Sequence, residues 1–230
     1  MRADLEQPLA RLLDSLAGSR VGVARREQPV DVVRREQPVD AAAREALATW
    51  IDLVESFNRR MDLTAASGAD ELCDLLVADA VVLAAHIAPG ARVVDVGSGA
   101  GAPGLPLAII RSDLQVQLVE PAQKRVAAMR SAIGRIFGPA AAGRAPVVRR
   151  QRGEDLVKEG LRFDVAVSRA TLPPDAWLPL GAKLAPEGKV WVLLAEAAPP
   201  SLAGWRVVDD VAYRWPLTDR PRRAVCYALG

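Results

Sequence analysis

The fold is decided by the stretch Val93-Val94-Asp95-Val96-Gly97-Ser98-Gly99-Ala100-Gly101. Its apolar first part predicts a buried strand that ends near Val96, and the three glycines that follow predict a tight turn. Glycine permits positive φ angles and lets a ligand approach the backbone closely. In open α/β sheets, ligands bind at the carboxyl ends of the strands. We therefore expect this turn to be a ligand-binding loop.

Strands and helices alternate around this loop. The expected strands are Arg92–Val96, Gln115–Val119, Val147–Gln151, Phe163–Val167 and Lys189–Leu194, and the expected helices between them are Leu105–Ile110, Lys124–Phe137, Glu154–Lys158 and Trp177–Leu184. This alternation predicts right-handed crossovers and a doubly wound, mostly parallel α/β sheet. No helix separates the last two strand candidates, Trp205–Tyr213 and Ala224–Leu229. They predict a terminal antiparallel hairpin.

Helical periodicity dominates the first third of the chain. Apolar residues recur at spacings of three and four in Leu5–Leu16, in Leu47–Met61, for which Asp40 is an available N-cap, and in Asp70–His86. The third of these helices carries Asp79 on its apolar face. An ionised carboxylate buried there requires a partner.

A tandem repeat of nine residues occupies Val23–Asp40. Two short copies are too few for a solenoid, in which repeats bury one another's faces. We interpret the repeat as a duplication within a linker. The domain prediction is an N-terminal extension over residues 1–40 and one α/β domain over residues 41–230.

The composition excludes several classes of protein. Half of the 230 residues are apolar and the formal net charge is only +2, so the overall charge gives no indication of a nucleic-acid partner. Cys73 and Cys226 are far apart and show no metal-ligand spacing. We expect no metal site and no membrane partner, because no long apolar run is present, and we expect a cytoplasmic protein.

The residues that follow the glycine loop favour one cofactor. Glu120 ends the second expected strand, where a carboxylate can accept both hydroxyls of an adenosine ribose. A dinucleotide would need free backbone N–H groups at the next helix, yet Pro103 and Pro106 remove two of them. S-adenosylmethionine, which has no phosphate, fits better than NAD, and a purely structural loop is the third alternative.

Five blocks of sequence together resemble the RsmG (GidB) family. They are Phe57–Ala65, Asp95–Pro106, Glu120 with Lys124-Arg125, Arg152-Gly153-Glu154 and Ser168-Arg169-Ala170. The resemblance runs from about Trp50 to Lys189 and implies a class I methyltransferase-like fold. It further implies transfer of a methyl group from S-adenosyl-L-methionine to guanine N7 in the 530 loop of 16S ribosomal RNA, with the RNA or the small ribosomal subunit as partner.

The resemblance also implies site residues. It places Gly97, Ala102, Gly153, Glu154 and Arg169 at the cofactor, beside Asp95, Gly99, Gly101 and Glu120 of the loop and the second strand. Arg169 follows an apolar strand and should emerge where the methyl group is transferred, which makes it the candidate catalytic residue. The structural alternative for Arg169 is an ion pair with Glu154 or another loop acid.

Basic residues are concentrated after Glu120. Eight cations and no acid lie between Pro121 and Gly153, a pattern suited to a phosphate backbone or, equally, to a solvated helix face. The residues predicted to bind RNA are Arg59, Arg60, Lys124, Arg125, Arg149 and Arg150. A second cluster, Arg220, Arg222 and Arg223, is interpreted as surface decoration beside an edge strand. His86, the only histidine, is interpreted as a packing residue.

Three departures from the family pattern keep two other functions open. Leu76 stands where the family usually has His, Asp62 where it has Asn, and Glu196 where it has Lys. One alternative is a related methyltransferase that acts on another RNA or on a small molecule. The other is a non-catalytic, cofactor-binding relic that binds RNA.

Overall fold

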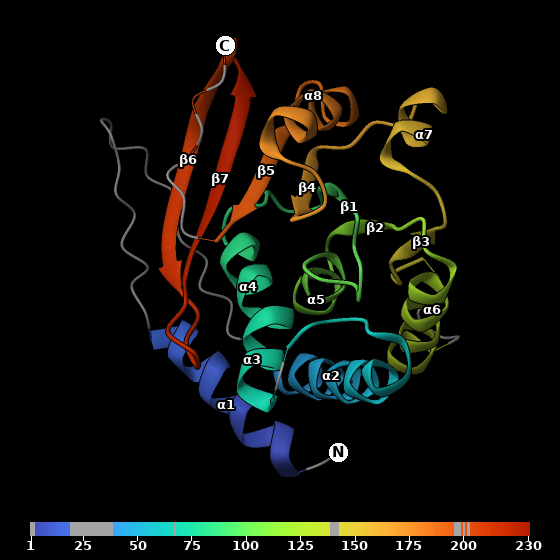
Figure 1. The fold of residues 1–230 in the computed structure, drawn as a ribbon, viewed down its shortest axis with the longest axis vertical. Helices are drawn as coiled ribbons and strands as arrows, with labels where there is room; N and C mark the ends of the chain where they lie inside the picture. Colours follow the sequence, from blue (N-terminus) through green and yellow to red (C-terminus); the bar gives the residue numbers. More distant parts are fainter. Residues whose placement is uncertain are drawn as a thin grey trace.

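A seven-stranded sheet with the strand order β3-β2-β1-β4-β5-β7-β6 forms the centre of the computed structural model (Figure 1). The structure describes residues 3–18, 39–66, 68–138, 143–195, 199, 201 and 203–230. The parallel strands are β1 (Arg92–Val96), β2 (Gln115–Val119), β3 (Val147–Arg149), β4 (Val165–Arg169) and β5 (Lys189–Leu194). The predicted mostly parallel α/β sheet is confirmed.

A long antiparallel hairpin completes the sheet. Strand β7 (Pro221–Leu229) pairs with β5, and β6 (Trp205–Arg214) pairs with β7 on its outer side. The terminal hairpin was therefore predicted correctly, but β6 is the edge strand and β7 is internal. Arg222 and Arg223 lie on this internal strand, beside the edge strand β6, and the interpretation of Arg220, Arg222 and Arg223 as surface decoration stays a prediction.

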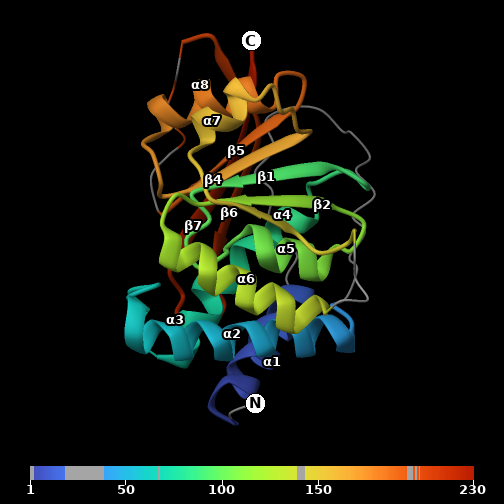
Figure 2. The same ribbon diagram turned by 90° about the vertical axis from the view of Figure 1, so that its right-hand side faces the viewer.

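Helices cover both faces of the sheet in layers (Figure 2). Helices α7 (Gly153–Lys158) and α8 (Pro174–Leu184) lie on one face, and α4 (Asp79–Ala84), α5 (Gly104–Ile110) and α6 (Gln123–Phe137) lie on the other. Helix α2 (Ala41–Met61) packs outside α5 and α6. Two groups of buried apolar side chains, one on each face, form the core.

The ends of α2 follow from its sequence. The side chain of Asp40 caps the helix by accepting a hydrogen bond from the Ala43 amide at 2.7 Å, as predicted. Asp62 ends the helix in the left-handed conformation, with φ of 48°. Asn and Asp both tolerate this conformation. The departure from Asn at position 62 thus has a structural explanation.

The helix predicted over Asp70–His86 contains an irregular turn. It is built from α3 (Ala69–Cys73), the π-helical turn η1 (Asp74–Ala78) and α4. π-Helical turns inside helices are rare and frequently occur at functional sites. Leu76, the second departure, is buried in the core within this turn.

Helix α1 (Ala3–Gly18) belongs to the same core as the domain. Its residues Leu5, Leu9, Leu12 and Leu13 are buried, and it packs against α3 and η1. Residues 23–38 of the tandem repeat and Glu196 lie outside the described residues. The domain boundary at residue 40 stays a prediction, and the burial of α1 indicates that truncation at this point would remove part of the core.

No helix in the described ranges is long and apolar enough to cross a membrane. Over the same residues, the structure brings together no group of three or more His, Cys, Asp or Glu side chains that would hold a metal ion. Cys73 and Cys226 are buried and unbridged, and burial raises the pKa of each thiol to about 12.

Candidate cofactor site and substrate face

The glycine loop connects β1 to α5 at the carboxyl edge of the sheet, as predicted. Gly97, Gly99 and Gly101 all have positive φ angles. A β-carbon on Gly97 would lie 2.0 Å from Thr171 Oγ1, so only glycine fits at that position. On Gly99 a β-carbon would meet nothing nearer than 3.9 Å. The loop is therefore packed on the Thr171 side and open for a ligand at Gly99.

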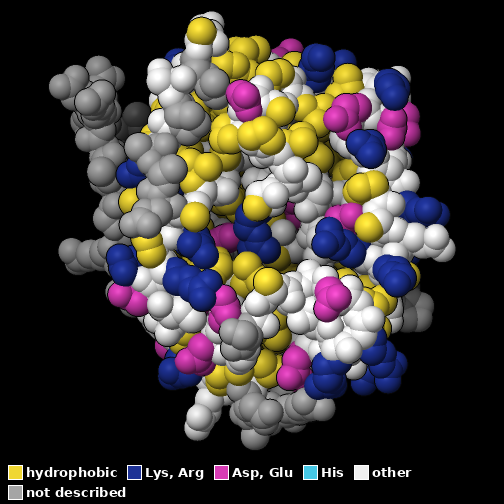
Figure 3. Space-filling view, in the orientation of Figure 1, with side chains coloured by type: hydrophobic (Ala, Val, Ile, Leu, Met, Phe, Trp, Pro, Cys, Tyr) yellow, Lys and Arg dark blue, Asp and Glu magenta, His cyan; other side chains and the backbone are white. Residues whose placement is uncertain are grey.

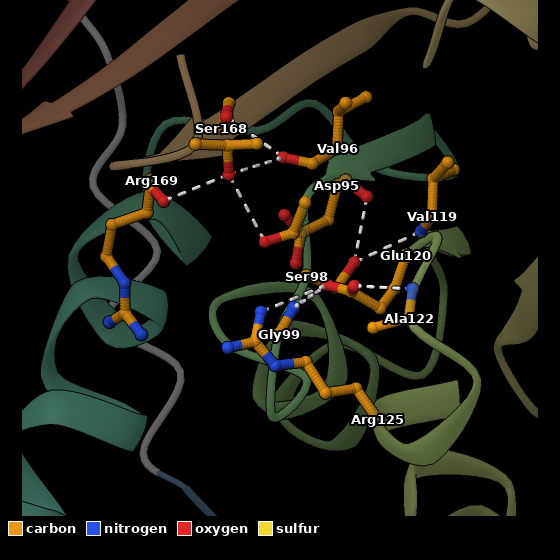
Figure 4. Close-up of polar contacts among 12 residues, drawn as sticks. Asp95, Val96, Ser98, Gly99, Val119, Glu120, Ala122, Arg125, Ser168 and Arg169 are labelled. Atoms are coloured by element: carbon orange, nitrogen blue, oxygen red, sulfur yellow. Dashed lines mark hydrogen bonds and ion pairs between the residues drawn. The ribbon is translucent and has the colours of Figure 1, made fainter. Parts of the chain in front are cut away.

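Backbone hydrogen bonds fasten this loop to β2. The amides of Gly97 and Ser98 donate to the Val119 carbonyl at 2.8 and 3.1 Å. The Ser98 hydroxyl donates to the Asp95 carbonyl at 2.8 Å and accepts from the Val119 amide at 3.1 Å (Figure 4). Ser98 was not among the predicted site residues, although a hydroxyl between two loop glycines is a signal for such a bridge.

Glu120 projects from the end of β2 toward the loop and is only 3 % exposed. Its Oε2 accepts from the Gly99 amide at 3.0 Å and its Oε1 from the Ala122 amide at 2.9 Å. A carboxylate offers about four acceptor positions, so two remain after these bonds. The structure thus orients the Glu120 carboxylate rigidly beside the open part of the loop.

The start of α5 has few donors left for a phosphate. Gly104 donates its amide to Asp95 Oδ2 at 2.9 Å, and Leu105 donates to the Gly101 carbonyl at 2.7 Å. Pro103 and Pro106 have no amide hydrogen. This arrangement agrees with the sequence-based preference for a cofactor without a pyrophosphate.

Asp95 is the most deeply buried acid of the loop, at 1 % exposure. Burial raises the pKa of its carboxyl to about 6, although the Gly104 amide favours the ionised form. Its Oδ1 is buried and accepts no hydrogen bond from any described residue. An unpaired buried carboxylate oxygen is costly, and a cationic ligand group would remove that cost.

The other predicted cofactor residues surround this loop at different depths. Ala102 is buried in the turn before α5, and Gly153 at the start of α7 packs against Val96 and Leu180. A β-carbon on Gly153 would lie 2.9 Å from Val96, so this glycine permits close packing of α7 on β1. Glu154, the next residue, is exposed. The structure brings these positions to the same edge of the sheet.

Arg169 ends β4 at this edge, but its guanidinium points away from Glu120 toward the helix formed by η1 and α4 (Figure 4). Its Nη1 donates to the Leu75 carbonyl, at 2.5 Å, and to Asp79 Oδ2, at 3.0 Å. Asp79 is 2 % exposed and also accepts from Tyr213 Oη at 2.6 Å and Trp215 Nε1 at 3.0 Å. The predicted requirement of Asp79 for a partner is confirmed. Arg169 does form an ion pair, but its partner is this helix residue and not Glu154 or another loop acid.

Some of the residues predicted to bind RNA are exposed, and others form ion pairs or hydrogen bonds within the protein. Arg60, Lys124 and Arg150 are exposed, and Arg59 forms an intrahelical pair with Glu55 at 3.7 Å. Arg125 lies 3.9 Å from Glu120. Arg149 donates to Gln117 at 2.7 Å and to Glu159 at 3.4 Å. Figure 3 shows basic side chains on both sides of a hollow near the middle of one face.

Comparison with known proteins identifies the family of this chain. The model of the GidB family, described as rRNA small subunit methyltransferase G, matches residues 43–198.

The chain belongs to this family.

Curated relatives carry the same description. The Ribosomal RNA small subunit methyltransferase G of Anaeromyxobacter dehalogenans (strain 2CP-1) is 38 % identical over 143 residues, which are 62 % of this chain and 64 % of the relative. The protein of the same name from Anaeromyxobacter sp. (strain Fw109-5) is 31 % identical over 187 residues, 78 % and 85 % of the two chains. The alignment to the first relative thus spans just under two thirds of its length.

A solved structure shows the same fold at low sequence identity. A SAM-dependent methyltransferase from Thiobacillus denitrificans, in complex with S-adenosyl-L-homocysteine, is 13 % identical and has a TM-score of 0.50. The likeness covers 68 % of this chain and 93 % of that protein. The family resemblance and the methyltransferase-like fold predicted from the sequence are both confirmed.

The contacts of two residues in this GidB family chain, Thr171 and His86, were not predicted from the sequence. Thr171 Oγ1 donates to the carbonyls of Val96 and Gly97 at 3.3 Å, after a turn in which Ala170 has a φ of 52°. His86 packs edge-on against Trp191, as its interpretation requires, but its Nδ1 also lies 2.7 Å from Asp209 Oδ2. Neither contact is visible in a local pattern, because the partners are far apart in the sequence.

Proposed function

We propose that the protein transfers a methyl group from S-adenosyl-L-methionine to N7 of a guanine in the 530 loop of 16S ribosomal RNA. The observation that carries this proposal is the buried Glu120 carboxylate, held by the Gly99 amide beside an open glycine loop in a chain of the rRNA small subunit methyltransferase G family. The RNA itself or the small ribosomal subunit is the partner, and the cytoplasm is the proposed location.

The residues at the loop fit the chemical groups of this cofactor. The two acceptor positions left on Glu120 match two ribose hydroxyls, and Gly99 leaves open space for the adenosine to approach. The unpaired Asp95 Oδ1 suits a positively charged group, and S-adenosylmethionine carries an ammonium as well as a sulfonium. When bound, the sulfonium supplies an electrophilic methyl group.

Methyl transfer to guanine N7 does not require the protein to remove a proton. Guanine N7 has an exposed lone pair and no proton, so alignment and electrostatics supply the catalysis rather than a general base. We assign to Arg169 the role of orienting the incoming guanine or the methionine end of the cofactor. Its Nη1 is engaged with Leu75 and Asp79, while its Nε and Nη2 have no acceptor among the described residues and can serve a ligand.

Basic side chains around the site support the choice of RNA over a small molecule. Lys124 and Arg125 lie on the first turn of α6, the helix that follows Glu120, and Arg150 follows β3 at the same edge of the sheet. Such cations neutralise phosphates and position the nucleic acid. Arg149 contributes less in this proposal, because Gln117 and Glu159 already hold its guanidinium.

Methylation of purified RNA tests the proposal. The protein should transfer labelled methyl groups from S-adenosylmethionine to 16S RNA, or to small subunits isolated from cells that lack the enzyme, and digestion should yield 7-methylguanosine. A different methylated nucleoside, or transfer only to another RNA, would favour the related methyltransferase with another substrate. Binding of both cofactor and RNA without any transfer would favour the non-catalytic alternative.

A further inference from the structure

A concave pocket of about 270 Å³ lies beyond the end of β5, at the edge of the sheet that carries the cofactor loop. Ala195 forms one wall, and residues of the β6–β7 hairpin, among them Tyr213 and Arg222, form the others. Strand β7 runs antiparallel to β5, so its first residues lie beside the last residues of β5, with Arg223 opposite Leu194. The pocket therefore lies at the same edge of the sheet as Arg169, which ends β4.

The arginines near the turn between β6 and β7 differ in whether a carboxylate pairs with them. Arg214 pairs with Asp219, Arg220 with Glu71 at 2.6 Å, and Arg223 with Asp210 at 3.2 Å. Of the three arginines that line the pocket, Arg214, Arg222 and Arg223, only Arg222 pairs with no carboxylate of the described residues. Its Nη1 donates to the Pro221 carbonyl, at 2.9 Å. Arg222 thus supplies the uncompensated positive charge of the pocket.

The guanidinium of Arg222 is also held in place. Its central carbon lies 3.6 Å from the centre of the Trp215 ring, and Trp215 is 2 % exposed. A cation stacked on a buried indole has lost part of its hydration and has a fixed orientation. A planar cation fixed in this way is suited to a phosphate or to a nucleobase stacked on its free face.

The pocket is connected to Arg169 by direct contacts. Trp215 Nε1 donates to Asp79 Oδ1, Tyr213 of the pocket wall donates to the same oxygen, and Arg169 donates to Asp79 Oδ2. Strands β4 and β7 are separated only by β5, which places them about 10 Å apart. A single nucleotide is long enough to reach from the pocket to the residues at the end of β4.

From these contacts we infer that the pocket holds one unpaired nucleotide of the RNA substrate, with its phosphate bound by Arg222. The inference rests on the proposed function and adds a substrate subsite to it. A volume of about 270 Å³ is slightly below the usual range of small-ligand pockets, which begins at about 300 Å³, and it cannot admit a duplex. Sequence-specific enzymes bind RNA in this way, because unpaired nucleotides expose both base and phosphate.

Arg222→Gln, Arg222→Lys and the control Arg162→Gln test this subsite. Arg162 is an exposed cation just before β4, at the opposite edge of the sheet, so its loss changes the net charge equally. For each variant, anisotropy would give the dissociation constant of a labelled 530-loop RNA hairpin at several salt concentrations. Calorimetry would give the affinity for S-adenosylhomocysteine, and thermal unfolding would show that the variant is folded.

Arg222→Gln should bind the RNA about tenfold more weakly or worse and lower the logarithmic salt slope by about 0.7, the value for one phosphate of a single strand. Arg222→Lys should keep the slope and still lose affinity, because lysine lacks the planar fork. Cofactor affinity should be unchanged in both variants.

Arg222 variants that behave like Arg162→Gln, while the wild-type protein methylates 16S RNA, would overturn the subsite and leave the proposed function standing. A wild-type protein that neither binds nor methylates the RNA would overturn both. Should Arg222→Gln fail to fold, Arg222→Lys decides the question, and RNA affinity equal to wild type in that variant would contradict the inference.

Discussion

Arg169 and Asp79 form a partly buried ion pair between the end of β4 and the start of α4, with 3.0 Å between Nη1 and Oδ2. The same carboxylate accepts from Tyr213 and Trp215, so one acid joins the parallel sheet, the helix with the π turn and the terminal hairpin. An arginine anchored by one nitrogen keeps its remaining donors in a fixed direction. Its position at the carboxyl edge then makes it a positioned group for the reaction rather than a mobile surface cation.

Arg169→Lys should fold normally and lose at least about tenfold in methyl transfer, equivalent to about 1.4 kcal/mol of transition-state stabilisation. A lysine can pair with Asp79 but cannot offer further donors in the plane of a guanidinium. Single-turnover rates at saturating cofactor and RNA would measure the loss. Turnover close to wild type would show that Arg169 is needed only for its ion pair.

Glu120→Ala should weaken the binding of S-adenosylmethionine by about 1 to 3 kcal/mol, because ribose hydroxyls would lose a charged acceptor. The matched control is Glu187→Ala, which removes an exposed acid outside the site. Titration calorimetry gives both affinities. Equal affinities in the two variants would remove Glu120 from the cofactor site.

Cofactor affinity should depend on pH through Asp95. Burial raises the pKa of this carboxyl from 3.8 to about 6, so in the free protein it takes up a proton as the pH falls below about 6. A neutral carboxyl cannot pair with a cation of the cofactor, and the affinity should therefore fall by up to about tenfold per pH unit below 6 and be constant above 7.

The variant Asp95→Asn provides the control for this titration. Its affinity should be lower at pH 7.5 and should vary little between pH 7.5 and 5.5, because the amide does not titrate. The raised pKa also means that the contribution of Asp95 to the stability of the cofactor-free protein is present below pH 3.8 and is lost as the pH rises to about 6. A wild-type affinity that is flat across this range would contradict the role given to Asp95.

Leu12→Ala in α1 should lower the free energy of unfolding by about 2 to 5 kcal/mol, because the side chain is fully buried in the domain core. Gln7→Ala on the exposed face of the same helix should change it by less than about 0.5 kcal/mol. Chemical denaturation measures both. Equal stability of the two variants would indicate that α1 lies outside the cooperative unit.

The sheet and the glycine loop were predictable because their signals are local. The strand from Arg92 to Val96 contains three valines and leads directly into the glycine-rich turn, and this pattern is visible within a few residues. Strand β7 was predicted to begin at Ala224 and begins at Pro221. Its first residues pair with β6, and such pairing depends on tertiary contacts that a local pattern does not contain.

The contacts of the site were predictable only in part. Glu120 was placed correctly at the end of β2, because a carboxylate after a strand has a defined position at the sheet edge. The partner of Arg169 was not predicted, since Asp79 lies 90 residues earlier in the chain. The acid on an apolar helix face signalled that Asp79 needed a partner, yet the pattern could not say which cation would supply it. Likewise, nothing local indicates that Gln117 and Glu159 hold Arg149.

The methylation state of 16S RNA in cells tests the central claim most directly. Mass spectrometry of 16S RNA fragments from a strain that lacks this gene should show one 7-methylguanosine fewer than in the parent, in the fragment that contains the 530 loop. Expression of the wild-type chain should restore that methyl group, and expression of Glu120→Ala should restore less of it. An unchanged 7-methylguanosine in the 530-loop fragment of the deletion strain would contradict the assignment of this protein as a 16S RNA guanine-N7 methyltransferase.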